Sequence, residues 1–291
     1  FRINIHLPVI RSRKKIIYLV LFILSIVPFF DKLLEIDSVV MATNESYDPG
    51  LRRLDDCEKM IAYVDSVYGS KEINPADTQA YVTILSQTFR SRFFHGSLNY
   101  KPHENWIASA CGKFLWSNLA SIVIPDDIMK HDQGLCSQQT IAFMNCLNKK
   151  GIPTRSVGLG YDEGPGHFVC EVGYEKGWHL FDVSLEPNWS NSLTDHSSIE
   201  YYVQNKDSLF LNYNQRLSRS TFDKIIERVK YGEANVMPAP RMRFFQTVTS
   251  IFSYALPVLF LFLFAASFKK DSFVSRQIKQ GSKVRLKKIS A

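Results

Sequence analysis

The sequence predicts an α+β domain flanked by two membrane-spanning helices. Three observations lead to this fold class. Two long apolar runs, 16–30 and 249–268, lie near the two ends of the chain. Between them, residues 131–187 change from helical spacing of apolar residues to strict alternation, which predicts a helix followed by strands. Other stretches with helical spacing predict further helices on either side of this region.

The distribution of charge separates the two ends of the chain from its middle. The 291-residue chain has a formal net charge of +7, but residues 1–30 carry five Lys and Arg without an acid, and residues 249–291 carry eight against one acid. Residues 31–248 therefore hold 22 basic and 27 acidic residues. Because a nucleic-acid-binding domain needs basic residues on its folded surface, no nucleic-acid partner is expected.

The two apolar runs set the expected topology. The 20 residues of 249–268 carry no charge and are long enough to cross about 30 Å of hydrocarbon. The 15-residue run 16–30 is shorter and is either a second anchor, which we favour, or the core of a cleaved signal peptide. Basic clusters beside membrane spans stay in the cytoplasm, so both termini are expected to be cytoplasmic and the domain between the runs extracytoplasmic.

The expected organisation follows from these spans and from local periodicity. The chain is predicted to consist of a cytoplasmic basic N-terminus (1–15), a transmembrane anchor (16–30), an extracytoplasmic domain (31–248, with its core at 130–187), a transmembrane helix (249–268) and a cytoplasmic basic tail (269–291). Within the domain, helices are predicted over 49–68, 75–95, 104–119, 136–149, 197–205 and 220–231, and strands over 154–160, 167–175 and 177–185.

Cys136 has the sequence position of a nucleophilic thiol. It follows a glycine turn at Gly134 and opens a predicted helix, whose N-terminal amides and dipole stabilise a thiolate and the oxyanion of acyl transfer. Gly151 suits the left-handed position that ends this helix. Cys146 and Cys170 fall within the helix and on a strand, as small buried residues do. No CxxC pair and no zinc-like spacing occurs, so neither a metal nor another cofactor is expected.

His167 and Asp182 are predicted to meet across a β-hairpin. If Tyr174 pairs with Gly177 at the turn, Val169 lies opposite Asp182 and His167 lies diagonally across from it. Diagonal neighbours are about 7–8 Å apart at the backbone, within reach of a His–Asp hydrogen bond. Asp182 would orient the imidazole, and His167 would exchange a proton with the thiol. A register shifted by one residue would place the two side chains on opposite faces.

The order of these motifs resembles the transglutaminase-like superfamily, whose core shares the thiol arrangement of papain. Four segments carry the resemblance: Gly-Leu-Cys at 134–136, Gly-Ile-Pro-Thr-Arg at 151–155, His-Phe-Val-Cys-Glu-Val at 167–172 and Gly-Trp-His-Leu-Phe-Asp at 177–182. The resemblance implies a papain/transglutaminase-like core, in which a catalytic cysteine at a helix N-terminus packs on an antiparallel sheet. It implies the triad of nucleophile Cys136, base Hіs167 and orienting Asp182.

The resemblance covers about residues 130–187, and two positions depart from the family pattern. Val183 stands where a proline often follows the aspartate, and Gln133 stands where a basic residue often precedes the glycine. Neither position belongs to the triad, so the departures concern the substrate rather than the chemistry. Gln133 and Trp106 are the candidate side-chain donors to the oxyanion.

These residues predict a membrane-anchored thiol enzyme, either a cysteine protease or amidase or an acyltransferase. It would cleave an amide bond in an extracytoplasmic peptide or protein through a thioester, which water or an amine then attacks. The fold does not choose between these two acceptors. The alternative is a catalytically idle transglutaminase-like scaffold that binds partner subunits in a membrane or cell-envelope complex.

Overall fold

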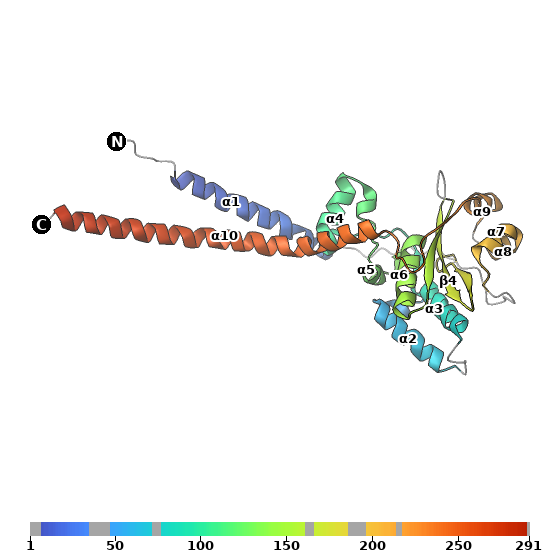
Figure 1. Cartoon of the computed structure of the whole chain (residues 1–291). Helices are drawn as coiled ribbons and strands as arrows, with labels where there is room; N and C mark the ends of the chain where they lie inside the picture. The colour runs from blue at the N-terminus through green and yellow to red at the C-terminus, as the bar shows by residue number, and fades with distance from the viewer. Residues whose placement is uncertain are drawn as a thin grey trace. The chain divides into compact units, whose positions relative to one another are not determined.

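A computed structural model of the chain describes residues 7–34, 47–71, 77–160, 166–185, 196–213 and 217–289. The chain forms two compact units. The first consists of Phe1–Asp37, Tyr100–Ala120 and Thr247–Ala291, and the second of Ser38–Asn99 and Ser121–Gln246. Long helices dominate the first unit, whereas the second combines helices with antiparallel sheet (Figure 1). The predicted mixture of helix and sheet is confirmed.

An antiparallel sheet of four strands forms the centre of the second unit, in the order β5-β4-β3-β6. Its strands are β3 (Thr154–Leu159), β4 (His167–Tyr174), β5 (Gly177–Phe181) and β6 (Val229–Tyr231). In the β4–β5 hairpin Tyr174 pairs with Gly177, and Cys170 pairs with Phe181, so the predicted register is confirmed. Both turn residues, Glu175 and Lys176, have positive φ, as in the two-residue turns that match the twist of paired strands.

One face of this sheet is covered by the helix that begins with the candidate nucleophile. This helix, α6 (Cys136–Lys149), packs against β3 and β4, and Figure 1 shows it beside β4. The hydroxyl of Thr140 donates to the carbonyl of Phe168 at 3.1 Å and joins the helix to the strand. Helices α2 (Cys57–Gly69), α3 (Thr78–Arg92) and α5 (Pro125–Met129) pack around α6. The aromatic rings of Phe89 in α3 and Phe143 in α6 lie 5.5 Å apart.

The opposite face of the sheet is covered by three short helices. These are α7 (Ile199–Gln204), α8 (Lys206–Tyr213) and α9 (Arg219–Ile226). Their buried apolar side chains form one core with Val169 of β4 and Leu180 of β5. The next residue of β5, Phe181, contacts Phe143 of α6, which confirms that successive side chains alternate between the two faces. Each side chain of the hairpin therefore faces either α6 or the three short helices, according to its position along the strand.

Both ends of α6 agree with the prediction of a helix over 136–149. At its C-terminal end, Gly151 has a φ of 72°, in the left-handed region that glycine adopts at little cost. The amide of Gly151 donates to Asn148 and the amide of Ile152 donates to Leu147, both at 3.0 Å. This pair of hydrogen bonds is the Schellman arrangement, and it satisfies carbonyls that would otherwise lack a partner at the helix end.

Several predicted elements differ from those of the structure. The predicted helix 220–231 ends at Ile226, and Val229–Tyr231 forms β6, because these residues find backbone partners on the open edge of β3. The predicted helix 104–119 ends at Phe114 and is followed by the 3-10 helix η3 (Ser117–Leu119). The predicted strand 177–185 ends at Phe181. Most of the predicted turn-rich loop, residues 161–165, lies outside the described residues.

Two helices long and apolar enough to cross a membrane belong largely to the first unit; their candidate spans are Arg13–Leu33 and Pro240–Phe268. The elements concerned are α1 (Leu7–Ile26), the 3-10 helix η1 (Val27–Leu34) and α10 (Pro240–Ile289). A third helix, α4 (Pro102–Phe114), belongs to the same unit. The helix α10 extends beyond the predicted span 249–268 at both ends.

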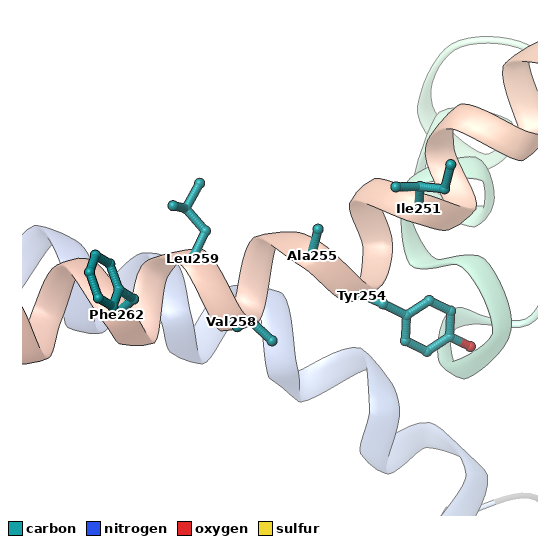
Figure 2. A pocket seen from close by; sticks show the side chains of 6 residues that line it. All are labelled: Ile251, Tyr254, Ala255, Val258, Leu259 and Phe262. Atoms are coloured by element: carbon teal, nitrogen blue, oxygen red, sulfur yellow. The ribbon is translucent and has the colours of Figure 1, made fainter.

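A stripe of apolar side chains follows one side of α10 and lines a shallow groove (Figure 2). The six residues are Ile251, Tyr254, Ala255, Val258, Leu259 and Phe262. Their spacing of three and four residues places them on one helix face. Val258 is 69% exposed and Phe262 is 67% exposed. An apolar helix face left open in this way is suited to a hydrocarbon environment.

Candidate active site

Cys136 occupies the first residue of α6, and its position is set by the segment that leads into the helix. Gln133 and Gly134 form the short strand β2, which pairs in parallel with β1 (Phe94–His95). The amides of Gln138 and Gln139 donate to the carbonyl of Leu135. The amides of Cys136 and Ser137 are therefore the donors of the first turn without an acceptor inside the helix, and they are available to an anion.

Two buried glutamines hold the backbone that leads into Cys136. The Oε1 atom of Gln138 accepts a hydrogen bond from the Leu135 amide at 3.0 Å, and its Nε2 donates to the carbonyls of Leu98 at 2.6 Å and Ile122 at 3.0 Å. The Nε2 of Gln139 donates to the carbonyl of Gly134 at 2.8 Å. The thiol therefore begins a helix whose entry is held by side-chain hydrogen bonds to three separate segments.

His167 and Asp182 lie at the same end of the β4–β5 hairpin. His167 is the first residue of β4, and Asp182 directly follows the last residue of β5. The Nε2 atom of His167 lies 2.6 Å from Oδ2 of Asp182, and both side chains are buried. The predicted His–Asp hydrogen bond is therefore present. Since Nε2 is engaged, Nδ1 is the ring nitrogen left for the Cys136 side chain, which also acts on the pKa of His167.

The carboxylate of Asp182 is surrounded by hydrogen-bond donors. The hydroxyl of Tyr213 in α8 donates to Oδ2 at 2.7 Å. Oδ1 accepts from the amide and the hydroxyl of Ser184, both at 3.1 Å, and from the amide of Leu185 at 3.0 Å. This set of donors fixes the carboxylate in one orientation, which in turn fixes the imidazole that it holds.

Burial and charge act in opposite directions on the protonation of this pair. Burial lowers the pKa of His167, but the charge and hydrogen bond of Asp182 and the hydrogen bond to Cys136 outweigh it and raise the pKa to about 10. Burial raises the pKa of Asp182, yet the charge and hydrogen bonds of His167, Leu185 and Tyr213 hold it well below its usual range. At neutral pH the pair is thus an imidazolium and a carboxylate.

The two candidate side-chain donors to an oxyanion have other partners. The Nε2 atom of Gln133 donates to the carbonyl of Ser97 at 2.8 Å, and the second hydrogen on this nitrogen remains. The indole N–H of Trp106 donates to the carbonyl of Ser253 at 3.0 Å, within the first unit. An indole has a single donor, so the hypothesis of Trp106 as an oxyanion donor is not supported. The amides of Cys136 and Ser137 remain the best-placed donors.

Sequence reasoning did not identify Gln138 or Tyr213 as parts of the site. Gln138 stands three residues after Leu135, and at this spacing a glutamine side chain can accept a hydrogen bond from the amide of the residue before the helix. The role of Gln138 could therefore have been predicted from the sequence. Tyr213 lies 31 residues beyond Asp182, in a helix that the sequence did not predict. No local pattern connects the two residues, because their contact depends on how α8 packs on the sheet.

Metal-binding side chains are dispersed over the described part of the chain. No three His, Cys, Asp or Glu residues come close enough there to hold a metal ion. No disulfide joins the five cysteines, all of which lie in the described part of the chain; three are buried, and Cys111 and Cys136 are partly exposed. Cys136 acts on the pKa of His167, and His167 bonds the carboxylate of Asp182, so the residues brought together are those of thiol chemistry.

Comparison with known proteins gave a weak similarity at the structural level. No model of a protein family matches the sequence, and no curated protein matches it. One solved structure, described as the crystal structure of a TGase, is similar to this chain with 17% sequence identity and a TM-score of 0.29. The similarity covers 54% of this chain and 37% of that protein, so this chain corresponds to well under half of the other.

Proposed function

We propose that this protein is a membrane-anchored thiol enzyme of the transglutaminase-like type, with Cys136 as nucleophile, His167 as acid and base, and Asp182 as the residue that orients His167. The observation that carries the proposal is the hydrogen bond from His167 to Asp182, at the N-terminal residue of β4 and the end of β5, together with the effect of Cys136, the first residue of α6, on the pKa of His167. Each side chain has the neighbour that its role requires.

The proposed reaction begins with the thiolate of Cys136 and the imidazolium of His167. The sulfur attacks the carbonyl carbon of a substrate amide, and the carbonyl electrons move to oxygen to give a tetrahedral oxyanion. The amides of Cys136 and Ser137 stabilise this oxyanion at the helix N-terminus. When the oxyanion collapses, the C–N bond breaks, the leaving nitrogen takes the proton of His167, and a thioester remains on Cys136.

The second half of the reaction releases the acyl group from Cys136. Water or an amine loses a proton to the now neutral His167 and attacks the thioester carbonyl, and the C–S bond breaks to regenerate the thiolate and the imidazolium. Water gives hydrolysis, as in a protease or amidase, and an amine gives acyl transfer. Asp182 keeps its charge throughout and stabilises the imidazolium whenever it forms.

The proposal places this chemistry outside the membrane. Two helices are long enough to cross it, and the basic residues lie on the far sides of both spans. The positive-inside rule then makes both termini cytoplasmic and the domain that contains Cys136 extracytoplasmic. The proposed substrate is a peptide or protein on that side of the membrane, and the proposed partners are subunits of a membrane complex.

Alkylation by iodoacetamide tests the proposed nucleophile without knowledge of the substrate. Cys136 and Cys111 are both partly exposed, and Cys111 serves as the matched control because it lies in α4, outside the unit that contains His167. The full-length Cys111→Ala and Cys136→Ala variants isolate one partly exposed thiol each. At neutral pH we expect Cys136 to react at least about tenfold faster than Cys111, because an imidazolium favours its thiolate. His167→Ala should remove this advantage.

A library of peptide amides then tests turnover directly. Amide cleavage, or transfer to an added amine, should occur with the wild-type chain and be lost in Cys136→Ala. Full activity in Cys136→Ala would overturn the proposed nucleophile. If Cys136 reacts no faster than Cys111 and no peptide amide is converted, the alternative of an idle scaffold that binds membrane partners is favoured instead.

A further inference from the structure

Three consecutive large apolar residues, at the last residue of α4 and the two positions after it, are open to the surroundings. Phe114 is 76% exposed, Leu115 is 78% exposed and Trp116 is 54% exposed. The neighbouring Lys113 is also exposed, and its ammonium group lies 5.7 Å from the centre of the Phe114 ring. A run of three exposed apolar residues is rare on a water-facing surface and usually marks a binding surface.

Hydrogen bonds fix the first half of α4 to the beginning of the apolar span in α10. Asn105 is fully buried, donates to the hydroxyl of Thr249 at 3.0 Å and accepts from the hydroxyl of Ser253 at 3.1 Å. The indole of Trp106 donates to the carbonyl of Ser253, and the hydroxyl of Tyr254 donates to the carbonyl of Glu104 at 3.2 Å. Figure 2 shows Tyr254 extending toward this segment.

The other candidate span reaches the same place. Its last turns lie in η1, where the ring of Phe29 is 5.3 Å from the ring of Tyr254. Asp31 of η1 lies 3.9 Å from the ring nitrogen of His103 in α4. The helix α4 is therefore held beside the last turns of the first candidate span and beside residues 249–254 of α10, where the uncharged run 249–268 begins. These six residues rise about 8 Å along the helix, which is comparable to the depth of a membrane interface.

The two ends of the segment that carries α4 are joined to each other. The amide of Tyr100 donates to the carbonyl of Ala120 at 2.8 Å, so residues 100–120 form a closed hairpin. The helix packs closely on the returning chain, because a Cβ added at Gly112 would lie 2.4 Å from the Cβ of Ala120. Phe114, Leu115 and Trp116 lie at the turn between these two legs, and they are held there by a firmly packed element.

We infer that this hairpin is a membrane-interface element, and that Phe114, Leu115 and Trp116 insert among the lipids beside the two spans. A tryptophan at the headgroup level and two apolar neighbours below it match the chemistry of that zone. The stem of Lys113 lies along the apolar tip while its ammonium group reaches lipid phosphates. We infer that a lipid bilayer contacts these three residues, because the hairpin that carries them is hydrogen-bonded to residues of the second span. The inference rests on the spans and not on the proposed enzymatic activity.

Quenching of tryptophan fluorescence by brominated lipids tests this inference on the full-length chain in phosphatidylcholine vesicles. The emission of Trp116 is obtained as the difference between the wild type and Trp116→Phe, a substitution at an exposed ring. We expect that difference to fall at least about twofold in vesicles whose acyl chains are brominated near the headgroup. Trp178 of the second unit is the matched control, and its difference emission, from Trp178→Phe, should not change.

A second variant moves the reporter and excludes a local effect of the substitution. Phe114→Trp in the Trp116→Phe chain should restore the quenching by brominated lipid. The inference is overturned if Trp116 is quenched by aqueous iodide and not by brominated lipid, because the tip is then in water. It is equally overturned if neither agent reaches Trp116, because a protein then covers the tip.

Discussion

Asp182 is a buried carboxylate that has donors on both oxygens, and its surroundings explain how a charge is kept inside this domain. An isolated buried carboxylate would be protonated, since burial favours the neutral form. Here His167, Tyr213, Ser184 and Leu185 all donate to it. The carboxylate therefore stays charged, and the charge raises the pKa of His167.

Asp182→Asn tests the role of this charge. The amide keeps the size of the side chain but removes the partner that raises the pKa of His167, so less imidazolium faces Cys136 at neutral pH. We expect the rate of alkylation at Cys136, and any amide turnover, to fall by roughly tenfold or more. An unchanged pH dependence of the alkylation rate would contradict the proposed role of Asp182.

Tyr213→Phe removes one hydrogen bond to Asp182 and leaves the packing of the ring in place. We expect the free energy of unfolding to fall by about 1–2 kcal/mol, because a buried charged acceptor loses a donor. The measurement is denaturant unfolding of the full-length chain in detergent. Because Asp182 then holds His167 less firmly, the alkylation of Cys136 should also slow, whereas a purely structural tyrosine would leave it unchanged.

The buried pair also makes stability depend on pH, with a sign that follows from the two shifts. The pKa of His167 is raised from 6.5 to about 10, so its stabilising effect is complete below pH 6.5 and is lost as pH rises through about 10. The pKa of Asp182 is lowered from 3.8, so its effect is present above that pH and is lost as the pH falls below it.

Comparison with the double variant His167→Gln, Asp182→Asn isolates this effect. We expect the thermal midpoint of the wild type to exceed that of the variant most clearly near about pH 5, and the difference to shrink toward about pH 10.5. Thermal unfolding followed by circular dichroism at a series of pH values provides the measurement. A difference that grew at high pH would show that His167 is not stabilised as the imidazolium.

At the scale of elements, the entry into α6 depends on the side chain of Gln138. Gln138→Leu leaves the amide of Leu135 and the carbonyls of Leu98 and Ile122 without this partner in a buried place. We expect a loss of about 2–4 kcal/mol in the free energy of unfolding, measured with urea. Gln133→Ala is the matched control; it loses one exposed hydrogen bond and should cost less than about 1 kcal/mol.

The sequence predicts those elements whose partners are adjacent along the chain. The bounds of α6 follow from Cys136 after a glycine turn and from Gly151 at its end, and the β4–β5 register follows from alternation around a two-residue turn. The meeting of His167 and Asp182 is a consequence of that register, so it was predictable.

The elements that the sequence does not predict depend on distant partners. Residues 229–231 continue a helical pattern, yet they become β6 because β3 offers an open edge. Tyr213 reaches Asp182 only because α8 packs on the sheet. The grouping of α4 with the long helices depends on the hydrogen bonds of Asn105 with Thr249 and Ser253. The spacing of apolar residues in α4 does not predict these polar contacts.

For the whole molecule, the proposed topology predicts which parts of the chain are accessible from outside a cell. Epitope tags at either end should be detected only after the membrane is permeabilised. The reason is that the basic residues between each span and the nearer chain terminus are expected to stay in the cytoplasm. A membrane-impermeant lysine reagent should modify Lys59 or Lys176 in intact cells. A tag at the N-terminus that is accessible in intact cells would contradict this topology.

The chain passes between its two units at four points, after residues 37, 99, 120 and 246. This division has a consequence for the release of the domain by proteases. A domain on a single tether is shed by one cut. Here, cuts near residues 37 and 246 would still leave the hairpin 100–120 joined to the domain at both of its ends. That hairpin is also hydrogen-bonded to Thr249 and Ser253. In the proposed topology, the domain would leave the membrane only if residues 100–120 were also cut away, which would release it as the two pieces 38–99 and 121–246. In the proposed topology, shedding of the domain is thereby disfavoured.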